Sequence, residues 1–135
     1  MPVMITELRG CTDPIAARLA EIGIIDAQAL LEHAATPAQR RTLADHVEVK
    51  TSVILALANR ADLARVRGVA GVYADLLERA GVDTVRELAT RRTDHLFERL
   101  ATVNAEAGIT PTPPTEGQVA KWIEQAKKLP ARLSY

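Results

Sequence analysis

Residues 8–31 read LRGCTDPIAARLAEIGIIDAQALL, and this stretch decides the fold because the chain repeats it 58 residues later. Residues 66–89 read VRGVAGVYADLLERAGVDTVRELA, with both glycine pairs and the Arg-Gly step in register. Alanine and leucine matches arise by chance in a chain rich in both, but aligned glycines are a much rarer coincidence. The two stretches therefore predict two copies of one helical unit.

Each copy has the same predicted order of elements. A short apolar helix leads into the Arg-Gly step, and a tight turn follows. The next helix ends at Gly23 or Gly81, where left-handed backbone is least costly. Apolar residues at spacings of three and four mark one face of that helix, so Ile15, Leu19 and Ile22 are predicted to be buried in the first copy. An equivalent apolar face occurs in the second copy.

Side chains that cap helix N-termini predict where the later helices begin. The candidates are Asp26, either Asp83 or Thr84, and two capping boxes, Thr36 with Gln39 and Thr115 with Gln118. Residues 50–59 are largely apolar and are predicted as a buried helix, although a short apolar run also fits a strand. The helical pattern on either side favours the helix.

The C-terminal part of the chain differs from the repeats. Residues 108–114, GITPTPP, predict a stiff extended connection, and a helix whose apolar face includes Trp122 follows. We therefore predict an all-α fold in one compact domain. Its parts are a first repeat over residues 1–58, a second repeat over residues 59–108, and a Pro-rich connection with a C-terminal docking helix over residues 109–135.

Composition limits the classes of function. The chain has 135 residues, with 17 Lys and Arg against 17 Asp and Glu, and this neutrality argues against a strongly basic nucleic-acid coat. A single cysteine excludes an internal disulfide framework and a multi-thiolate metal site. The N-terminus carries no signal pattern, and no apolar run approaches the roughly 18 residues of a membrane span. We expect a cytoplasmic protein without membrane contact.

The repeated pattern resembles a known arrangement. An apolar helix, a glycine turn and a helix with an early alanine resemble the helix-hairpin-helix motif, whose tandem, SAM-like form occurs in DNA repair and recombination proteins. ADLARVRGVAGVYADLLERAGVDTVRELA, together with KWIEQAKKLP, is similar to the bacterial family called domain of unknown function 4332. The resemblance covers nearly the whole chain. It implies two hairpins packed about a pseudo-two-fold axis, and no established activity.

In the motif that the chain resembles, the turn glycines bring backbone N–H groups close to a nucleic-acid phosphate, and the next helix adds the positive end of its dipole. The first hairpin departs from this pattern, because Thr12 replaces the second glycine and Asp13 brings a carboxylate to the anion site. Asp13 is predicted to cap its own helix. The residues of this degenerate first hairpin are Gly10, Cys11, Thr12 and Asp13.

The second hairpin is the better candidate for contact with a phosphate backbone. It has no acidic residue before Asp75, and two arginines flank the turn. Ala70 replaces the second glycine, but Gly71 follows at once. The candidate contact residues are Arg65, Arg67, Gly68, Val69, Ala70 and Gly71. For both hairpins the alternative is that the turns are only corners between packed helices.

No arrangement of residues indicates catalysis. His33, His46 and His95 lack metal-ligand spacing, and no P-loop, Rossmann or Gly-x-Ser-x-Gly motif occurs. Cys11 precedes a helix, whose dipole would favour a thiolate, but Asp13 opposes this. We therefore expect no catalytic residue, no metal, no cofactor and no enzymatic activity.

Two functions fit these observations. The first is a protein-interaction or scaffold module that contacts another protein or itself, through the exposed side of the Pro-rich connection and C-terminal helix. Neutral charge and the degenerate first hairpin favour it. The alternative is weak, sequence-independent binding of a DNA or RNA backbone through the second hairpin. Other basic pairs, such as Arg91 with Arg92, are more typical of a solvated face, and no small-molecule cofactor is expected.

Overall fold

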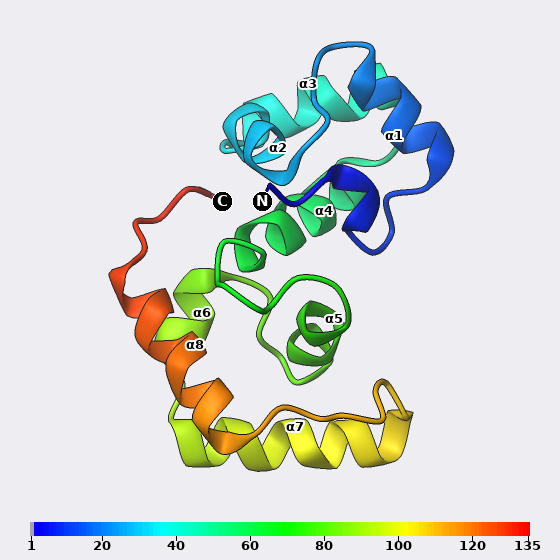
Figure 1. Ribbon diagram of the computed structural model, residues 1–135. Coiled ribbons are helices and arrows are strands. Elements are labelled where there is room, and N and C mark those ends of the chain that lie inside the picture. The colour runs from blue at the N-terminus through cyan, green and yellow to red at the C-terminus, as the bar shows by residue number, and fades with distance from the viewer. Residues whose placement is uncertain (1) are drawn as a thin grey trace. The chain divides into compact units, whose positions relative to one another are not determined.

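The computed structural model describes residues 2–135, whose regular elements are all helices (Figure 1). No strand occurs in this range, and its one β-bridge joins Met4 to Asp26. The all-α prediction is therefore confirmed. The elements are η1 (Ile5–Glu7), α1 (Asp13–Ala20), α2 (Ala27–His33), α3 (Pro37–Val47), α4 (Thr51–Leu63), α5 (Val72–Arg79), α6 (Val85–Ala89), α7 (Thr93–Ala107) and α8 (Glu116–Lys128).

The chain forms two compact units, each with its own core. The first unit contains the described residues up to Asp62 together with Arg132–Tyr135, and the second contains Leu63–Ala131. These units differ from the three segments predicted from the sequence, because α8 packs against α6 and α7 within the second unit. The last residues belong to the first unit, where the Ser134 N–H donates to the Ala35 carbonyl at 2.8 Å.

Glycines with positive φ lie in the turns that follow α1 and α5, although α1 itself already ends at Ala20. Gly23 and Gly81 have φ values of +80° and +94°, a region of backbone conformation that residues with a side chain rarely adopt. After each glycine the chain turns back onto the helix that it has just left. The Ile24 N–H donates to the Leu19 carbonyl at 3.0 Å, and the equivalent bond in the second unit is 2.8 Å long. The turn therefore directs the next apolar side chain into the core, where Ile24 is fully buried.

The predicted caps of α2, α3, α6 and α8 are present. Asp26 accepts a hydrogen bond from the Ala29 N–H at 2.7 Å. Thr84, rather than Asp83, caps α6 by accepting a hydrogen bond from the Glu87 N–H at 3.1 Å. Both predicted capping boxes form, at the starts of α3 and α8. These local interactions set the helix boundaries independently of the rest of the fold.

Burial confirms most of the predicted apolar faces and corrects one. Leu19 is fully buried on α1, but Ile22 is 44% exposed, so its predicted place in the buried stripe is wrong. The reason is that α1 ends at Ala20, and Ile22 no longer follows the helical spacing. The helix predicted over residues 50–59 is present as α4, which begins at Thr51, and its Ile54 and Leu57 belong to the core of the first unit.

The Pro-rich connection is held against the second unit by polar contacts. Tyr73 donates its hydroxyl to the Thr112 carbonyl at 2.8 Å. The Asn104 amide both donates to the carbonyl and accepts from the N–H of Thr110, each at 2.9 Å. Trp122 on α8 is 4% exposed and contacts the Tyr73 ring. In the part of the chain described here, no helix is long and apolar enough to cross a membrane.

Substitution of Leu19 and of Ile22 tests whether Leu19 is buried and Ile22 is exposed. We expect Leu19→Ala to lower the free energy of unfolding by about 2–5 kcal/mol, because it leaves a cavity in the core of the first unit. Ile22→Ala should lower it by less than about 1 kcal/mol, because the side chain is already partly in water. Urea unfolding followed by circular dichroism measures both. Equal losses would contradict the exposure of Ile22.

Candidate functional site

The second hairpin connects α4 to α5 and contains two glycines with positive φ. Gly68 has a φ of +89°, and Gly71, with a φ of +74°, is the N-cap residue of α5. Val69 lies between them with its side chain fully buried, and its N–H donates to the Val66 carbonyl at 3.1 Å. Ala70 is half-buried. The turn therefore packs Val69, one of the predicted contact residues, into the core and leaves Gly68 and Gly71 exposed.

Helix α8, which belongs to the same unit, packs against the turn of the second hairpin and covers it. The Gln125 Oε1 atom accepts a hydrogen bond from the Arg67 N–H at 3.0 Å. A Cβ placed on Gly68 would lie 3.5 Å from Trp122 Nε1, so the indole packs directly against the turn. The Arg65 guanidinium donates to the carbonyl of Pro130, just beyond α8. Much of the hydrogen-bonding capacity predicted for a phosphate is thus used by the protein itself.

The two predicted arginines therefore differ in availability. Arg65 is half-buried and bound to a backbone carbonyl, whereas Arg67 is exposed. The Arg67 side chain makes no hydrogen bond or ion pair with residues 2–135. The N-terminus of α5 has no side-chain cap hydrogen bond. What the second hairpin can offer an anion is one free guanidinium and the first N–H groups of α5.

Helix α4 closes the first hairpin in a similar way. Gly10 has a φ of +89°, the same value as Gly68. Arg60 on α4 donates to the carbonyl of Arg9, and a Cβ placed on Gly10 would lie 2.7 Å from Arg60 Nη1 and 4.0 Å from Leu57 Cδ2. The first turn is therefore covered by a side chain of its own unit, as the second one is.

Asp13 does not cap α1, so that prediction is wrong. Helix α1 begins at Asp13, which leaves Thr12 as the N-cap residue, and this N-cap makes no side-chain hydrogen bond. Asp13 remains exposed at the start of the helix, where its charge acts on Cys11. Burial raises the pKa of the Cys11 thiol, and the nearby Asp13 carboxylate raises that pKa further. The prediction that Asp13 opposes a thiolate at this position is confirmed.

The histidines lie apart from one another in local roles. His33 Nδ1 is 2.8 Å from the Ala29 carbonyl, and His46 Nε2 is 3.0 Å from the carbonyl of Arg18. His95 is exposed on α7 in the other unit. Among residues 2–135, no group of three or more His, Cys, Asp or Glu side chains is arranged to hold a metal ion.

Exposed apolar side chains occur where the sequence interpretation did not expect them. Ile22 and Ile25, in the loop between α1 and α2, are 44% and 50% exposed. We call them the isoleucine loop. The second copy has Ala80 and Asp83 at the equivalent positions. This difference between the repeats is the feature of the sequence that could have pointed to the exposed isoleucines. The predicted docking face on α8 instead exposes charged side chains, such as Lys121.

Comparison with known proteins identifies a family. A family model described as "Domain of unknown function (DUF4332)" matches residues 9–129, which include both hairpins and α8. This match confirms the resemblance found in the sequence. No curated protein and no solved structure matches the chain. The family description assigns no activity.

Gly68 and Gly117 form a matched pair for testing the closed hairpin. Gly68→Ala should lower the free energy of unfolding by about 1–2 kcal/mol, because an L side chain is strained at its φ of +89°. Gly117 lies in α8, where a Cβ would be 3.9 Å from its nearest neighbour, Thr115 Oγ1. Gly117→Ala should therefore raise that free energy by up to about 1 kcal/mol. Denaturant unfolding measures both, and a neutral Gly68→Ala would contradict the strained turn.

Proposed function

Given that the chain belongs to the DUF4332 family, we propose that its two units are tandem helix-hairpin-helix repeats that act as a non-catalytic binding module. The order of elements supports the repeat. Helices α1 to α4 have 8, 7, 11 and 13 residues, and α5 to α8 have 8, 5, 15 and 13. In each unit a glycine turn precedes the first helix of this series.

The closure of the two hairpins supports the same proposal. Leu57 and Arg60 lie three residues apart on α4 and cover the first hairpin. Trp122 and Gln125 have the same spacing on α8 and cover the second. Equivalent helices thus contact equivalent turns from equivalent positions, which is what duplication of one unit predicts.

Contact with another protein is the function that we favour, and the isoleucine loop is the observation that carries it. Exposed neighbouring apolar side chains are typical of interaction surfaces when the fold does not require them. The second repeat forms the same turn with Ala80 and Asp83, so the turn itself does not need two isoleucines.

A second copy of the chain is the partner that we propose for this loop. Two-fold dimers are the commonest oligomers, and in such a dimer one apolar loop meets its own copy. Since 17 basic residues balance 17 acidic ones, no net repulsion opposes self-association. Two isoleucines on each side make a small contact, so the dimer is expected to be weak and reversible.

Analytical ultracentrifugation tests this proposal. We expect the average mass to rise from monomer towards dimer between about 10 µM and 1 mM, the range of a weak complex. Ile25→Glu should hold the protein at the monomer mass, because it removes apolar area and places like charges opposite each other. Val72→Glu is the matched control, since Val72 is 45% exposed in the other unit, and it should dimerise normally. A strict monomer at all concentrations would contradict the proposal.

Binding of a nucleic-acid backbone is the second candidate, and the free Arg67 side chain beside the uncapped α5 favours it. A phosphate at this point would meet backbone N–H groups and one guanidinium. Because Arg65 and the Arg67 N–H are already engaged, such a contact would involve few phosphates and would read little sequence.

A duplex titration at low salt tests the second candidate. A contact with a few phosphates predicts a log–log slope of affinity against salt of about −2 to −4. Arg67→Ala should weaken binding and reduce that slope by about 1. Arg86→Ala, at an exposed position on α6, is the control and should leave both unchanged. Absence of binding at tens of micromolar (about 50 µM) would rule this candidate out.

A further inference from the structure

The second unit contains a hollow of about 390 Å³ at the end of α5 and the first turns of α7. Its floor is apolar, because Ala80 and Leu96 are only 5% and 2% exposed. Its rim carries three guanidinium groups and an imidazole. We call this site the arginine hollow, and its basic residues are Arg91, Arg92, His95 and Arg99.

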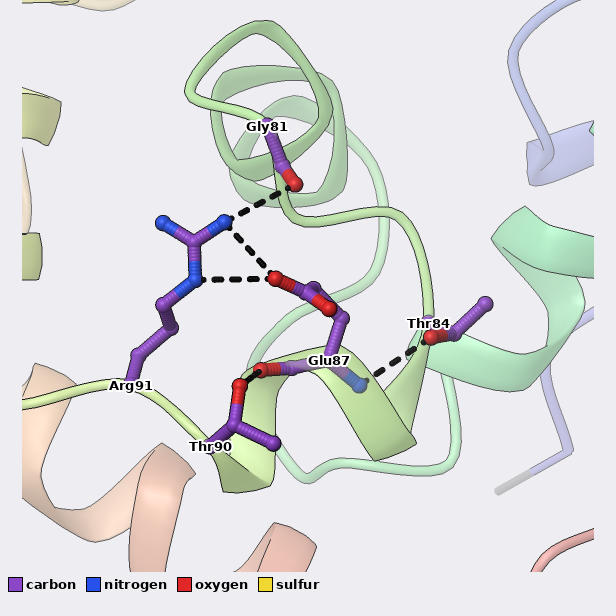
Figure 2. A network of polar contacts seen from close by, with 5 residues as sticks. All are labelled: Gly81, Thr84, Glu87, Thr90 and Arg91. Carbon is purple, nitrogen blue, oxygen red and sulfur yellow. Dashed lines mark hydrogen bonds and ion pairs between the residues drawn. The ribbon is translucent and has the colours of Figure 1, made fainter.

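One of these guanidinium groups is fixed by hydrogen bonds (Figure 2). Arg91 Nε and Nη2 donate to Glu87 Oε1 at 3.1 and 2.8 Å, and Nη2 also donates to the Gly81 carbonyl at 3.2 Å. Glu87 is itself placed by α6, whose N-terminus is capped by Thr84. Arg91 is therefore held in position while its Nη1 makes no hydrogen bond within the described residues. A donor fixed in advance is what an anion site needs.

The positive charge at the rim is only partly neutralised. Arg92 pairs with Asp94 across 3.0 Å, and Arg91 pairs with Glu87. Arg99 and the His95 ring are exposed, and neither makes a side-chain hydrogen bond or ion pair with any residue that the structure describes. Arg99 therefore has no protein acceptor or counter-charge, whereas His95 interacts electrostatically with the neighbouring Asp94 carboxylate.

The N-terminus of α7 also lacks the capping box that begins α3 and α8. Helices α3 and α8 each begin with a threonine N-cap and a glutamine three residues later. Helix α7 has Arg92 and His95 at these two positions. Arg92 makes no cap hydrogen bond, and the Asp94 carboxylate of the first turn accepts the His95 N–H at 2.9 Å instead. Basic side chains at a helix N-terminus are unfavourable beside the positive end of the dipole. Asp94 offsets part of this unfavourable charge, but loss of the capping-box pattern is typical of positions selected for function.

We infer that the arginine hollow binds the phosphate group of a small phosphomonoester. Guanidinium forks match pairs of phosphate oxygens, and a phosphate suits a rim on which Arg99 has no counter-charge and Arg91 Nη1 has no acceptor. The apolar floor fits the uncharged body of such a ligand. The volume lies near the lower end of the roughly 300–1,000 Å³ typical of small-molecule sites. The isoleucine loop belongs to the other unit, so this inference does not rest on self-association.

Two-dimensional NMR of the full chain tests the inference, with phenyl phosphate and inorganic phosphate as probes at constant ionic strength. We expect saturable shifts of amide signals confined to residues 80–99. Phenyl phosphate should bind more tightly, because its ring covers the apolar floor. Arg99→Gln should weaken phenyl phosphate binding about tenfold, since it removes a charge-assisted hydrogen bond. Arg99 has no partner among residues 2–135, so this variant should fold normally.

Arg86→Gln is the matched control, because Arg86 is an exposed arginine of the same unit outside the arginine hollow. It should change the affinity for phenyl phosphate by less than about twofold. Equal weakening by both variants, or no saturable shift at about 10 mM probe, would overturn the inference. A short DNA duplex distinguishes the source of the phosphate. If the same amides respond to the duplex and not to phenyl phosphate, the arginine hollow is a nucleic-acid contact and the inference is wrong.

Discussion

The backbone at Gly10 and Gly68 is the constraint on which each unit depends. Both residues have a φ of +89°, which lets the chain reverse direction within a few residues between two helices. The missing side chain matters as much as the dihedral angle. It leaves room for Arg60 over the first turn and for Trp122 over the second. One residue type thus permits both the reversal of the chain and the close approach of the helix that packs against it.

This close approach has a consequence for function. A glycine turn binds phosphate when its N–H groups and nearby cations remain open to solvent. Here a helix of the same unit covers each turn: Gln125 accepts the Arg67 N–H in the second hairpin, and Arg60 lies over Gly10 in the first while it donates to the Arg9 carbonyl. Differences between the repeats are therefore better guides to binding than the shared turns. The isoleucine loop and the arginine hollow both lie where one copy departs from the other.

Local interactions explain how much of the fold could be predicted. The glycine turns after α1 and α5 and both capping boxes depend on residues within a few positions of one another, and these turns and capping boxes were predicted correctly. Errors arose where a boundary moved by one or two residues, since α1 starts at Asp13 and ends before Ile22. The hydrogen bond of Arg65 could not be predicted, because its acceptor, the Pro130 carbonyl, is 65 positions away in the sequence. The arginine hollow likewise forms only because the end of α5 lies near α7, which the sequence does not show. The spacing of Arg92, His95 and Arg99, which places them on one face of a helix, could be read from the sequence.

The neutral net charge of the chain excludes less than the sequence alone suggested. A chain with 17 charges of each sign produces little field at long range, which argues against steering of a polyanion over a broad surface. At physiological salt, however, exposed charges interact over only about 8 Å. Within that distance an anion in the arginine hollow would meet the four basic groups of its rim and the two carboxylates paired with them. Neutrality of the whole chain is therefore compatible with a local site for an anion, and it also removes an obstacle to contact between two copies.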